Sequence, residues 1–155
     1  FDPPVRQDLL VRMRQSLRPG DALFLGTDLV KPERELLLAY DDPLQVTAAF
    51  NRNVLRRIND ELGGTFDLDA FEHRALWNGH DQRVEMHLVA TRAQHVSIPG
   101  AGLELSFEAG ETIWTESSYK YEPEQVRRFG EDAGFRAATQ WVDTRARFAL
   151  TGFTV

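Results

Sequence analysis

The sequence predicts an α/β fold, and three stretches of the chain support this prediction. Near the N-terminal end, a helical pattern, a Pro-Gly turn and a short apolar strand follow one another within residues 2–28. Near the C-terminal end, a helix is predicted over residues 122–135, and two strand candidates follow it, at residues 138–142 and 148–155. These two strands are close enough to form an antiparallel hairpin. The stretch between the two ends mixes helical and strand patterns, which indicates an inserted α+β segment.

The N-terminal pattern is specific enough to place its elements. Asp2 is a candidate N-cap, prolines occupy the first turn of the helix, and "RPGD" ends it. The run "ALFLGTD", residues 22–28, is apolar almost throughout and follows that turn. Such a run is typical of a strand buried on both faces, as in a parallel sheet.

Three helical segments are predicted within the insertion. The first covers residues 32–40 and begins at a proline. The second covers residues 47–62, with Thr47 as N-cap and Gly63-Gly64 as its stop. The third, over residues 67–73, has one or two turns capped by Asp67. The longest helix has one apolar stripe, made of Phe50, Val54, Leu55, Ile58 and Leu62.

Strands are predicted after the third helical segment. Residues 83–91, "RVEMHLVAT", alternate in polarity, so His87 is expected to face outward. The opposite, apolar face holds Val84, Met86, Leu88 and Ala90. "QHVSIPG", residues 94–100, is a candidate partner for this strand. Residues 103–121 alternate again, turn at Ala109-Gly110 and continue as a second strand.

Composition limits the classes of function. The chain has 155 residues, of which 42% are hydrophobic and 27% charged, as in a globular domain with its own core. Its formal net charge of −6 argues against a nucleic-acid-binding surface. The sequence has no cysteine, which excludes disulfides and thiolate chemistry and is consistent with a cytoplasmic location. No apolar run approaches the roughly 20 residues of a membrane-spanning helix, so no membrane partner is expected.

A series of motifs gives a more specific signal. The segments "AYDD", "TAAFNRN", "FEH", "RVEMHLVA" and "GETIWTESSYKY" occur in this order. In this combination the chain resembles the histidine-specific methyltransferase family, whose type member trimethylates the α-amino group of L-histidine on the ergothioneine pathway. The resemblance runs from about Pro19 to Ala133 and continues more loosely to the end of the chain.

The resemblance implies a fold, a cofactor and a division of the chain. Residues 1–29 and 122–155 are expected to form the second half of a class I, Rossmann-like methyltransferase core, and residues 30–121 its substrate-recognition insertion. S-adenosylmethionine is the implied methyl donor. Family members bind it at a glycine-rich strand-to-helix turn, whereas "ELGG" and "GAG" here lack a strand before and a helix after.

The donor site is therefore expected mostly in an N-terminal half that this sequence does not contain. By resemblance, Phe1 falls just after the fourth strand of the sheet, which leaves a sheet edge to be paired. The expected partner is the missing half or a second copy of the chain. The isolated chain is expected to be inactive.

Two side chains of "TESSYKY" suit an imidazole. Glu116 and Ser118 are spaced i, i+2, so on a strand they share one face. A neutral imidazole has one donor and one acceptor, which a carboxylate and a hydroxyl can match. The residues alone equally allow a solvated strand with ordinary polar side chains. The resemblance implies that Glu116 and Ser118 bind the imidazole of the substrate.

Four further residues are implied by the resemblance. Tyr40 is expected to hydrogen-bond the substrate carboxylate, and Met86 to lie against the substrate side chain. Thr47 and Phe50 are additional candidates for substrate contact. From the residues alone, Tyr40 also reads as a half-buried helix end and Met86 as a core residue.

Other polar residues suggest no site. The four histidines lack metal-ligand spacing, Asp41 and Asp42 are typical of a solvated or capping turn, and Lys31 and Lys120 are left unassigned. Two alternative functions stay open. One is methylation of another amino acid's α-amine, such as that of an indole-containing substrate; the other is a non-catalytic fragment that only binds substrate.

Overall fold

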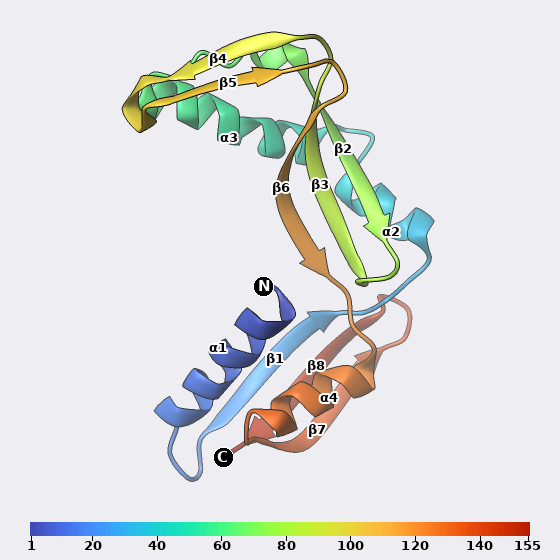
Figure 1. Cartoon of the computed structure of the whole chain (residues 1–155). Helices are drawn as coiled ribbons and strands as arrows, with labels where there is room; N and C mark the ends of the chain where they lie inside the picture. The colour runs from blue at the N-terminus through green and yellow to red at the C-terminus, as the bar shows by residue number, and fades with distance from the viewer. The chain divides into compact units, whose positions relative to one another are not determined.

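The computed structural model describes residues 1–155, including every side chain except those of Ala137 and Ala138. The chain divides into two compact units. The terminal unit comprises Phe1–Pro32, His80–Arg83 and Ser118–Val155, and the central unit comprises Glu33–Gly79 and Val84–Ser117. Figure 1 traces the elements of each unit.

The terminal unit contains a three-stranded antiparallel sheet and two helices. In chain order its elements are α1 (Pro3–Ser16), β1 (Ala22–Asp28), α4 (Pro123–Asp132), β7 (Arg136–Asp143) and β8 (Phe148–Thr154). Strand β8 lies in the middle of the sheet and pairs antiparallel with both β1 and β7 (Figure 1). The core between α1, α4 and the sheet is made of Leu10, Val126, Phe129, Ala133, Phe135 and Phe153.

Helix α4 is capped at its N-terminus and packs closely against the sheet in its last turns. Glu122 and Gln125 form a capping box, and Pro123 occupies the first helical position. Gly130 lies so close to β8 that an added Cβ would stand 2.2 Å from Cε1 of Phe153. Only glycine permits this approach of helix to strand.

The central unit contains two longer helices, two sheets and two short 3₁₀ turns. Helices α2 (Glu33–Tyr40) and α3 (Val46–Leu62) come first. The three-stranded sheet has the order β2-β3-β6, formed by Phe71–Asn78, Arg83–Ala90 and Thr112–Tyr119, of which Arg83, Ser118 and Tyr119 belong to the terminal unit. Strands β4 (Gln94–Ile98) and β5 (Leu103–Phe107) pair antiparallel with each other, and the 3₁₀ turns are Leu68–Ala70 and Pro99–Ala101.

One cluster of apolar residues joins α3 to both sheets of this unit. Its buried members are Leu55, Phe66, Phe71, Leu88, Ala90, Val96 and Ile98. The predicted apolar face of β3 is confirmed, because Val84, Met86, Leu88 and Ala90 are all at most 4% exposed. The predicted hairpin of β7 and β8 is also confirmed.

Strand β1 differs from its prediction in both partner and burial. It lies at one end of the sheet order and pairs antiparallel with β8, so the prediction of a parallel strand buried on both faces is wrong for this chain. Phe24 is 61% exposed. Both faces of a strand are buried only if a layer of helices or another sheet covers each of them. Leu23 and Leu25 pack against the core of the terminal unit, whereas Phe24 lies on the other face of β1. The fold shown is mixed α/β with antiparallel sheets.

Helix α3 begins one residue before its predicted N-cap. Thr47 lies in the first turn, and the capping carboxylate comes from Asp42, which accepts hydrogen bonds from the backbone N–H of Val46 at 3.1 Å and of Thr47 at 2.8 Å. The residue before the helix is Gln45, with φ of 59°. An aspartate upstream of the helix therefore replaces the threonine cap.

Three other local predictions need correction. Only part of the apolar stripe of α3 is buried, because Leu55 is 1% exposed and Ile58 packs against the core, whereas Phe50 is 69% exposed. The short helix ends at Ala70, and Phe71 already belongs to β2. Residues 94–98 pair with β5, not with β3.

No helix among the described residues is long and apolar enough to cross a membrane.

Candidate functional site

Strand β6 carries the predicted carboxylate and hydroxyl pair. Glu116 is exposed, and its backbone carbonyl accepts a hydrogen bond of 3.0 Å from Nε1 of Trp114. Ser118 is half-buried near the end of the strand. The two residues are separated by one position on a continuous strand, so their side chains share a face. Their binding to an imidazole stays a prediction.

Met86 lies on the neighbouring strand but on the other face of the sheet. The rings of His87 and Trp114 stack with centroids 5.9 Å apart and an interplanar angle of 20°. Since residues two apart on a strand share a face, Trp114 and Glu116 are on the His87 side. Met86 points to the opposite side and is only 4% exposed. Its backbone carbonyl accepts a 2.9 Å hydrogen bond from Oγ1 of Thr115.

His87 lies on the face opposite Met86, as expected, but that face is not open to solvent there. Its side chain is only 12% exposed, and that of its neighbour Glu85 only 14%. Nε2 of His87 lies 3.4 Å from a carboxylate oxygen of Glu85, and the Trp114 ring covers the imidazole. This face of the sheet is therefore covered by aromatic and charged side chains.

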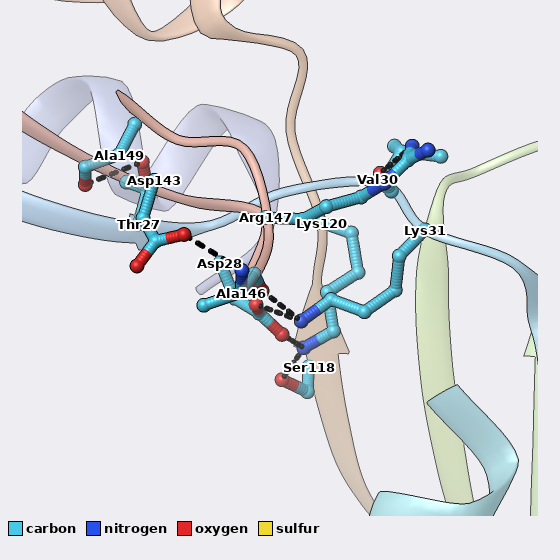
Figure 2. Close-up of polar contacts among 10 residues, drawn as sticks. All are labelled: Thr27, Asp28, Val30, Lys31, Ser118, Lys120, Asp143, Ala146, Arg147 and Ala149. Carbon is cyan, nitrogen blue, oxygen red and sulfur yellow. Dashed lines mark hydrogen bonds and ion pairs between the residues drawn. The ribbon is translucent and has the colours of Figure 1, made fainter. Parts of the chain in front are cut away.

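The hydroxyl of Ser118 accepts a hydrogen bond from a buried lysine. Nζ of Lys120 donates a 2.7 Å hydrogen bond to Oγ of Ser118 and forms an ion pair of 3.2 Å with Asp28, and the Lys120 side chain is 1% exposed. The second oxygen of Asp28 binds Nζ of Lys31 at 2.7 Å. Figure 2 shows both lysines converging on this one carboxylate. All four residues belong to the terminal unit.

Tyr40 is anchored through its backbone. Nε2 of His73 lies 2.7 Å from the carbonyl oxygen of Tyr40, and Nδ1 of His73 lies 2.9 Å from the amide nitrogen of Asn51. The same amide nitrogen donates to the carbonyl of His87 at 3.3 Å. Asn51 is 4% exposed. This network ties the end of α2 to α3, β2 and β3.

Thr47 and Phe50 lie at the start of α3, beside the capping carboxylate. The hydrogen bonds from the backbone of Thr47 and then of Val46 hold the pKa of Asp42 below its ordinary value of 3.8. Phe50 lines an open pocket of the central unit. The other residues around that pocket are Ala49, Arg52, Asn53, Arg56, Leu68 and Asp69.

A second pocket lies within the terminal unit. It is lined by Lys120 and by the tyrosines on either side of it, Tyr119 and Tyr121. The hydroxyl of Tyr119 donates to Asp2 at 2.7 Å and accepts from Arg83 at 3.1 Å. Burial raises the pKa of Tyr119 above its ordinary 10.0, and the hydrogen bond to Asp2 acts in the same direction.

The two glycine-rich segments have structural roles. Gly63 ends α3 in the left-handed region, with φ of 67°. Gly100 lies in a 3₁₀ turn that follows β4, and an added Cβ there would stand 2.9 Å from the backbone of Leu62. Neither segment joins a strand to a following α-helix, so neither has the geometry of a nucleotide-binding turn. The described side chains also include no group of three or more His, Asp or Glu able to hold a metal ion.

Comparisons with known proteins identify the class to which this chain belongs. A sequence model of the histidine-specific, S-adenosylmethionine-dependent methyltransferases matches residues 1–155. The chain therefore belongs to this methyltransferase family.

Curated relatives match almost the whole chain. A histidine N-alpha-methyltransferase of Mycolicibacterium smegmatis is 49% identical over 149 residues, and one of Mycobacterium tuberculosis is 45% identical over the same length. Each match covers 96% of this chain and 46% of the relative. Ergothioneine biosynthesis protein 1 of Schizosaccharomyces pombe is 24% identical over 151 residues, which is 19% of its length. The chain thus spans about half the length of the bacterial relatives.

The structure relates the six predicted residues in different ways. Glu116 on β6, Met86 on β3, Tyr40 on α2, and Thr47 and Phe50 on α3 belong to the central unit, and Ser118 belongs to the terminal unit. Their common action on one ligand stays a prediction.

Sequence reasoning missed the roles of two polar residues. Lys120 continues the i, i+2 series of Glu116 and Ser118, so alternation was a usable signal for its contact with the hydroxyl. Asn51 is buried in the middle of α3, whereas Asn53, two residues further along the helix, is exposed. No signal in the sequence predicts which of the two asparagines is buried.

Proposed function

We propose that the protein carrying this chain transfers methyl groups from S-adenosylmethionine to the α-amino group of L-histidine, giving the trimethylated product hercynine. The carboxylate and hydroxyl pair on β6 carries the proposal, in a chain that belongs to the histidine-specific family. The names of the mycobacterial relatives and the ergothioneine-related name of the yeast relative support it. A cytoplasmic location stays a prediction.

Recognition of the imidazole is proposed for Glu116 and Ser118. A carboxylate accepts the ring N–H, and a hydroxyl donates to the unprotonated ring nitrogen. An indole has one donor and no ring acceptor, so it would leave the hydroxyl without a partner. This difference favours histidine over an indole-containing amino acid by the cost of an unsatisfied polar group.

The remaining contacts are proposed from the family resemblance. The hydroxyl of Tyr40 would bind the substrate carboxylate, and the network of His73 and Asn51 supports the placement of that residue by holding its backbone. The resemblance alone supports Met86 as a wall of the pocket, because its side chain is on the core side of the sheet. Thr47 and Phe50 are proposed as further contacts at the start of α3.

The chemistry asks little of the protein beyond positioning. When bound, S-adenosylmethionine supplies a methyl group on a positively charged sulfur. The chain must hold the α-amine in line with that methyl group and hold the rest of the substrate still, which supplies much of the rate. We assign no residue of this chain to the methyl donor, since neither glycine-rich segment fits it.

We also propose a place for the chain in the methyltransferase fold. Residues 1–29 and 122–155 would form the second half of a class I core, and residues 30–121 a substrate-recognition insertion. The open end of the sheet at β1 would pair with a strand of another segment or of a second copy. On this proposal, the 155 residues alone bind substrate but do not turn it over.

A methyl-transfer assay tests the proposed function. The complete protein is incubated with S-adenosylmethionine carrying labelled methyl groups and with L-histidine, and the products are separated by mass. We expect label on the α-nitrogen, in one, two and finally three methyl increments. Transfer of the label to L-tryptophan but not to L-histidine would contradict the proposal. Transfer to neither amino acid would contradict it as well.

A further inference from the structure

We propose that the pocket bordered by helices α1 and α4 of the terminal unit is a further ligand site, which binds a small molecule through one carboxylate. Arg6 of α1 is the anchor of this site. The pocket has a volume of about 310 Å³, and every residue that lines it belongs to the terminal unit. Cavities of this size hold small organic ligands. The inference is independent of the proposed function, because it uses none of the residues assigned to L-histidine.

Arg6 is a cation without an anionic partner in the described part of the chain. Its Cζ lies over two aromatic rings, 4.2 Å from the centroid of Phe129 and 5.5 Å from that of Tyr121. Its Nε is buried and has no hydrogen-bond partner among the described residues. The rings attract the positive charge, but they offer no oxygen atom to its N–H groups. A buried charged donor without an acceptor is unfavourable, so an acceptor that reaches this nitrogen gains affinity from it.

The geometry of the guanidinium favours a carboxylate as that acceptor. Its N–H donors lie in one plane and point outward, with Nε beside a terminal nitrogen along one edge. Two parallel hydrogen bonds from such an edge match the two oxygens of a carboxylate. The contacts with Phe129 and Tyr121 hold the guanidinium in place before a ligand binds, which lowers the entropic cost of binding.

Gln82 supplies a second donor to the same pocket. It lies in the turn between β2 and β3, where its backbone carbonyl accepts a 2.7 Å hydrogen bond from the N–H of Lys120. Its side-chain oxygen accepts from Nε2 of Gln125 at 3.1 Å. Both contacts use oxygen atoms, and the described contacts leave the amide nitrogen of Gln82 without an acceptor. This nitrogen is available to donate to a ligand oxygen in the pocket.

The two other cations of the pocket are less suited to anchor a ligand. Nζ of Lys120 forms an ion pair with Asp28 at 3.2 Å, and Nε of Arg128 lies 3.9 Å from the carboxylate of Glu124. The Arg128 side chain is 73% exposed, so water and salt screen its charge. Arg6 is thus the cation through which the pocket attracts a carboxylate.

The acidic residues of the pocket restrict the ligand to one negative charge. Asp81 and Asp132 line the pocket together with Arg6. Asp81 pairs with Arg83 at 3.2 Å, whereas the described contacts give Asp132 no cation. These carboxylates repel a second negative charge on the ligand. A monocarboxylate therefore fits the pocket better than a phosphate, although arginine binds both groups.

A second cavity also borders Arg6, but it is less suited to a carboxylate. Its walls are mostly apolar, and it reaches β1 at residues 25–27. Gln82 is not among the residues that line it. The pocket bordered by α1 and α4 has no lining residue from β1, so a strand that pairs with the open end of β1 would not fill it.

Calorimetric titration of benzoate into the complete protein at neutral pH tests the inference. Benzoate carries one carboxylate on a rigid body, and benzamide is its uncharged counterpart of nearly the same shape. We expect benzoate to bind and benzamide to bind at least about tenfold more weakly, because an amide loses the charge-assisted pair with Arg6. Equal affinity for the two compounds overturns the inference, and so does a lack of benzoate binding.

Two arginines of α1 locate the binding. Arg6→Met removes the guanidinium and should weaken benzoate binding about tenfold, which brings the affinity close to that for benzamide. Arg12→Met is the matched control, because Arg12 is 74% exposed, pairs with Asp8 at 2.8 Å and does not line the pocket. It should change the affinity for benzoate by less than about twofold. An Arg6→Met protein that keeps the full preference for benzoate over benzamide overturns the inference.

Competition distinguishes a carboxylate from a phosphate ligand. Acetate and inorganic phosphate are added at equal concentrations to the complex with benzoate. Acetate should displace benzoate more effectively, because the more highly charged phosphate is repelled by Asp81 and Asp132. Equal or stronger displacement by phosphate overturns the restriction to one negative charge.

Gln82→Glu keeps the test decisive if Arg6→Met does not fold. The glutamate retains an oxygen for Gln125 and replaces the amide donor by a negative charge within the pocket. Benzoate should then bind about tenfold more weakly, whereas the uncharged benzamide should be affected less. Unchanged binding of benzoate by Gln82→Glu overturns the assignment of this pocket.

Discussion

Nε2 of His73 lies 2.7 Å from the backbone carbonyl oxygen of Tyr40. A carbonyl can only accept, so this ring nitrogen carries the proton and Nδ1 of the neutral ring accepts from the amide of Asn51 at 2.9 Å. The tautomer of His73 is therefore set by its two partners. Through them, the last residue of α2 is held against α3 and β2, which gives a candidate substrate residue a fixed backbone.

Replacing Asn51 should destabilise the protein measurably. Asn51→Leu leaves Nδ1 of His73 and the carbonyl of His87 without the amide donor, which costs about 1–3 kcal/mol in the free energy of unfolding. Chemical denaturation measures this loss. Asn53→Leu, at an exposed position of the same helix, is the control and should change stability by less than about 0.5 kcal/mol. Equal effects from the two variants would show that the buried network contributes nothing.

Gly130→Ala should be destabilising because helix α4 has no room for a Cβ at this point. The new atom would stand 2.2 Å from Phe153, so the helix must move or the ring must turn. Overpacking of this kind costs about 1–3 kcal/mol. Adding Phe153→Leu should restore part of the loss in Gly130→Ala, which a double-mutant cycle detects as coupling between the two sites. Purely additive losses would contradict the close approach.

Asp42 should stabilise helix α3 in a pH-dependent way. Its pKa is lowered in the folded state by the backbone hydrogen bonds of Thr47 and Val46, so the unfolded chain binds its proton more readily. The stabilisation is fully present above 3.8, the ordinary pKa, and is lost as the pH falls through the lower folded value. Asp42→Ala should therefore lower the melting temperature at pH 7, and the difference from the unchanged protein should shrink in acid.

The neighbouring Asp41 provides the control for this experiment. It is exposed, and Asp41→Ala should leave the melting temperature nearly unchanged at both pH values. A loss for Asp42→Ala that is equally large in acid would mean that the carboxylate does not act as the cap.

The elements that local signals determine were predictable from the sequence. The capping residues and the glycine stop located α1, α3 and α4 to within a few residues, and alternation identified the buried face of β3. The partners of strands were less predictable. Strand β4 pairs with β5 although β3 precedes it directly, and β1 has an antiparallel neighbour from the far end of the chain. The pairing of β1 with β8 joins distant segments, which no local pattern encodes, whereas β4 and β5 are adjacent in the chain.

The candidate site also has a part that the sequence predicts and a part that it does not. Alternation correctly predicts that Glu116 and Ser118 lie on one strand. The same spacing of two residues leads on to Lys120. The pairing of Lys120 with Asp28 joins segments far apart in the sequence, so it could not be predicted. Met86 was assigned to the pocket by resemblance, while its own alternation already indicated the core, where its side chain is 4% exposed.

Binding of L-histidine by the complete protein tests the central claim most directly, with Glu116→Ala and Glu116→Gln compared against the unchanged protein by calorimetry. The account predicts that the unchanged protein binds L-histidine, and that both variants bind it about tenfold to a hundredfold more weakly, because an imidazole N–H loses its charged acceptor. Equal affinity of all three proteins for L-histidine would contradict the account.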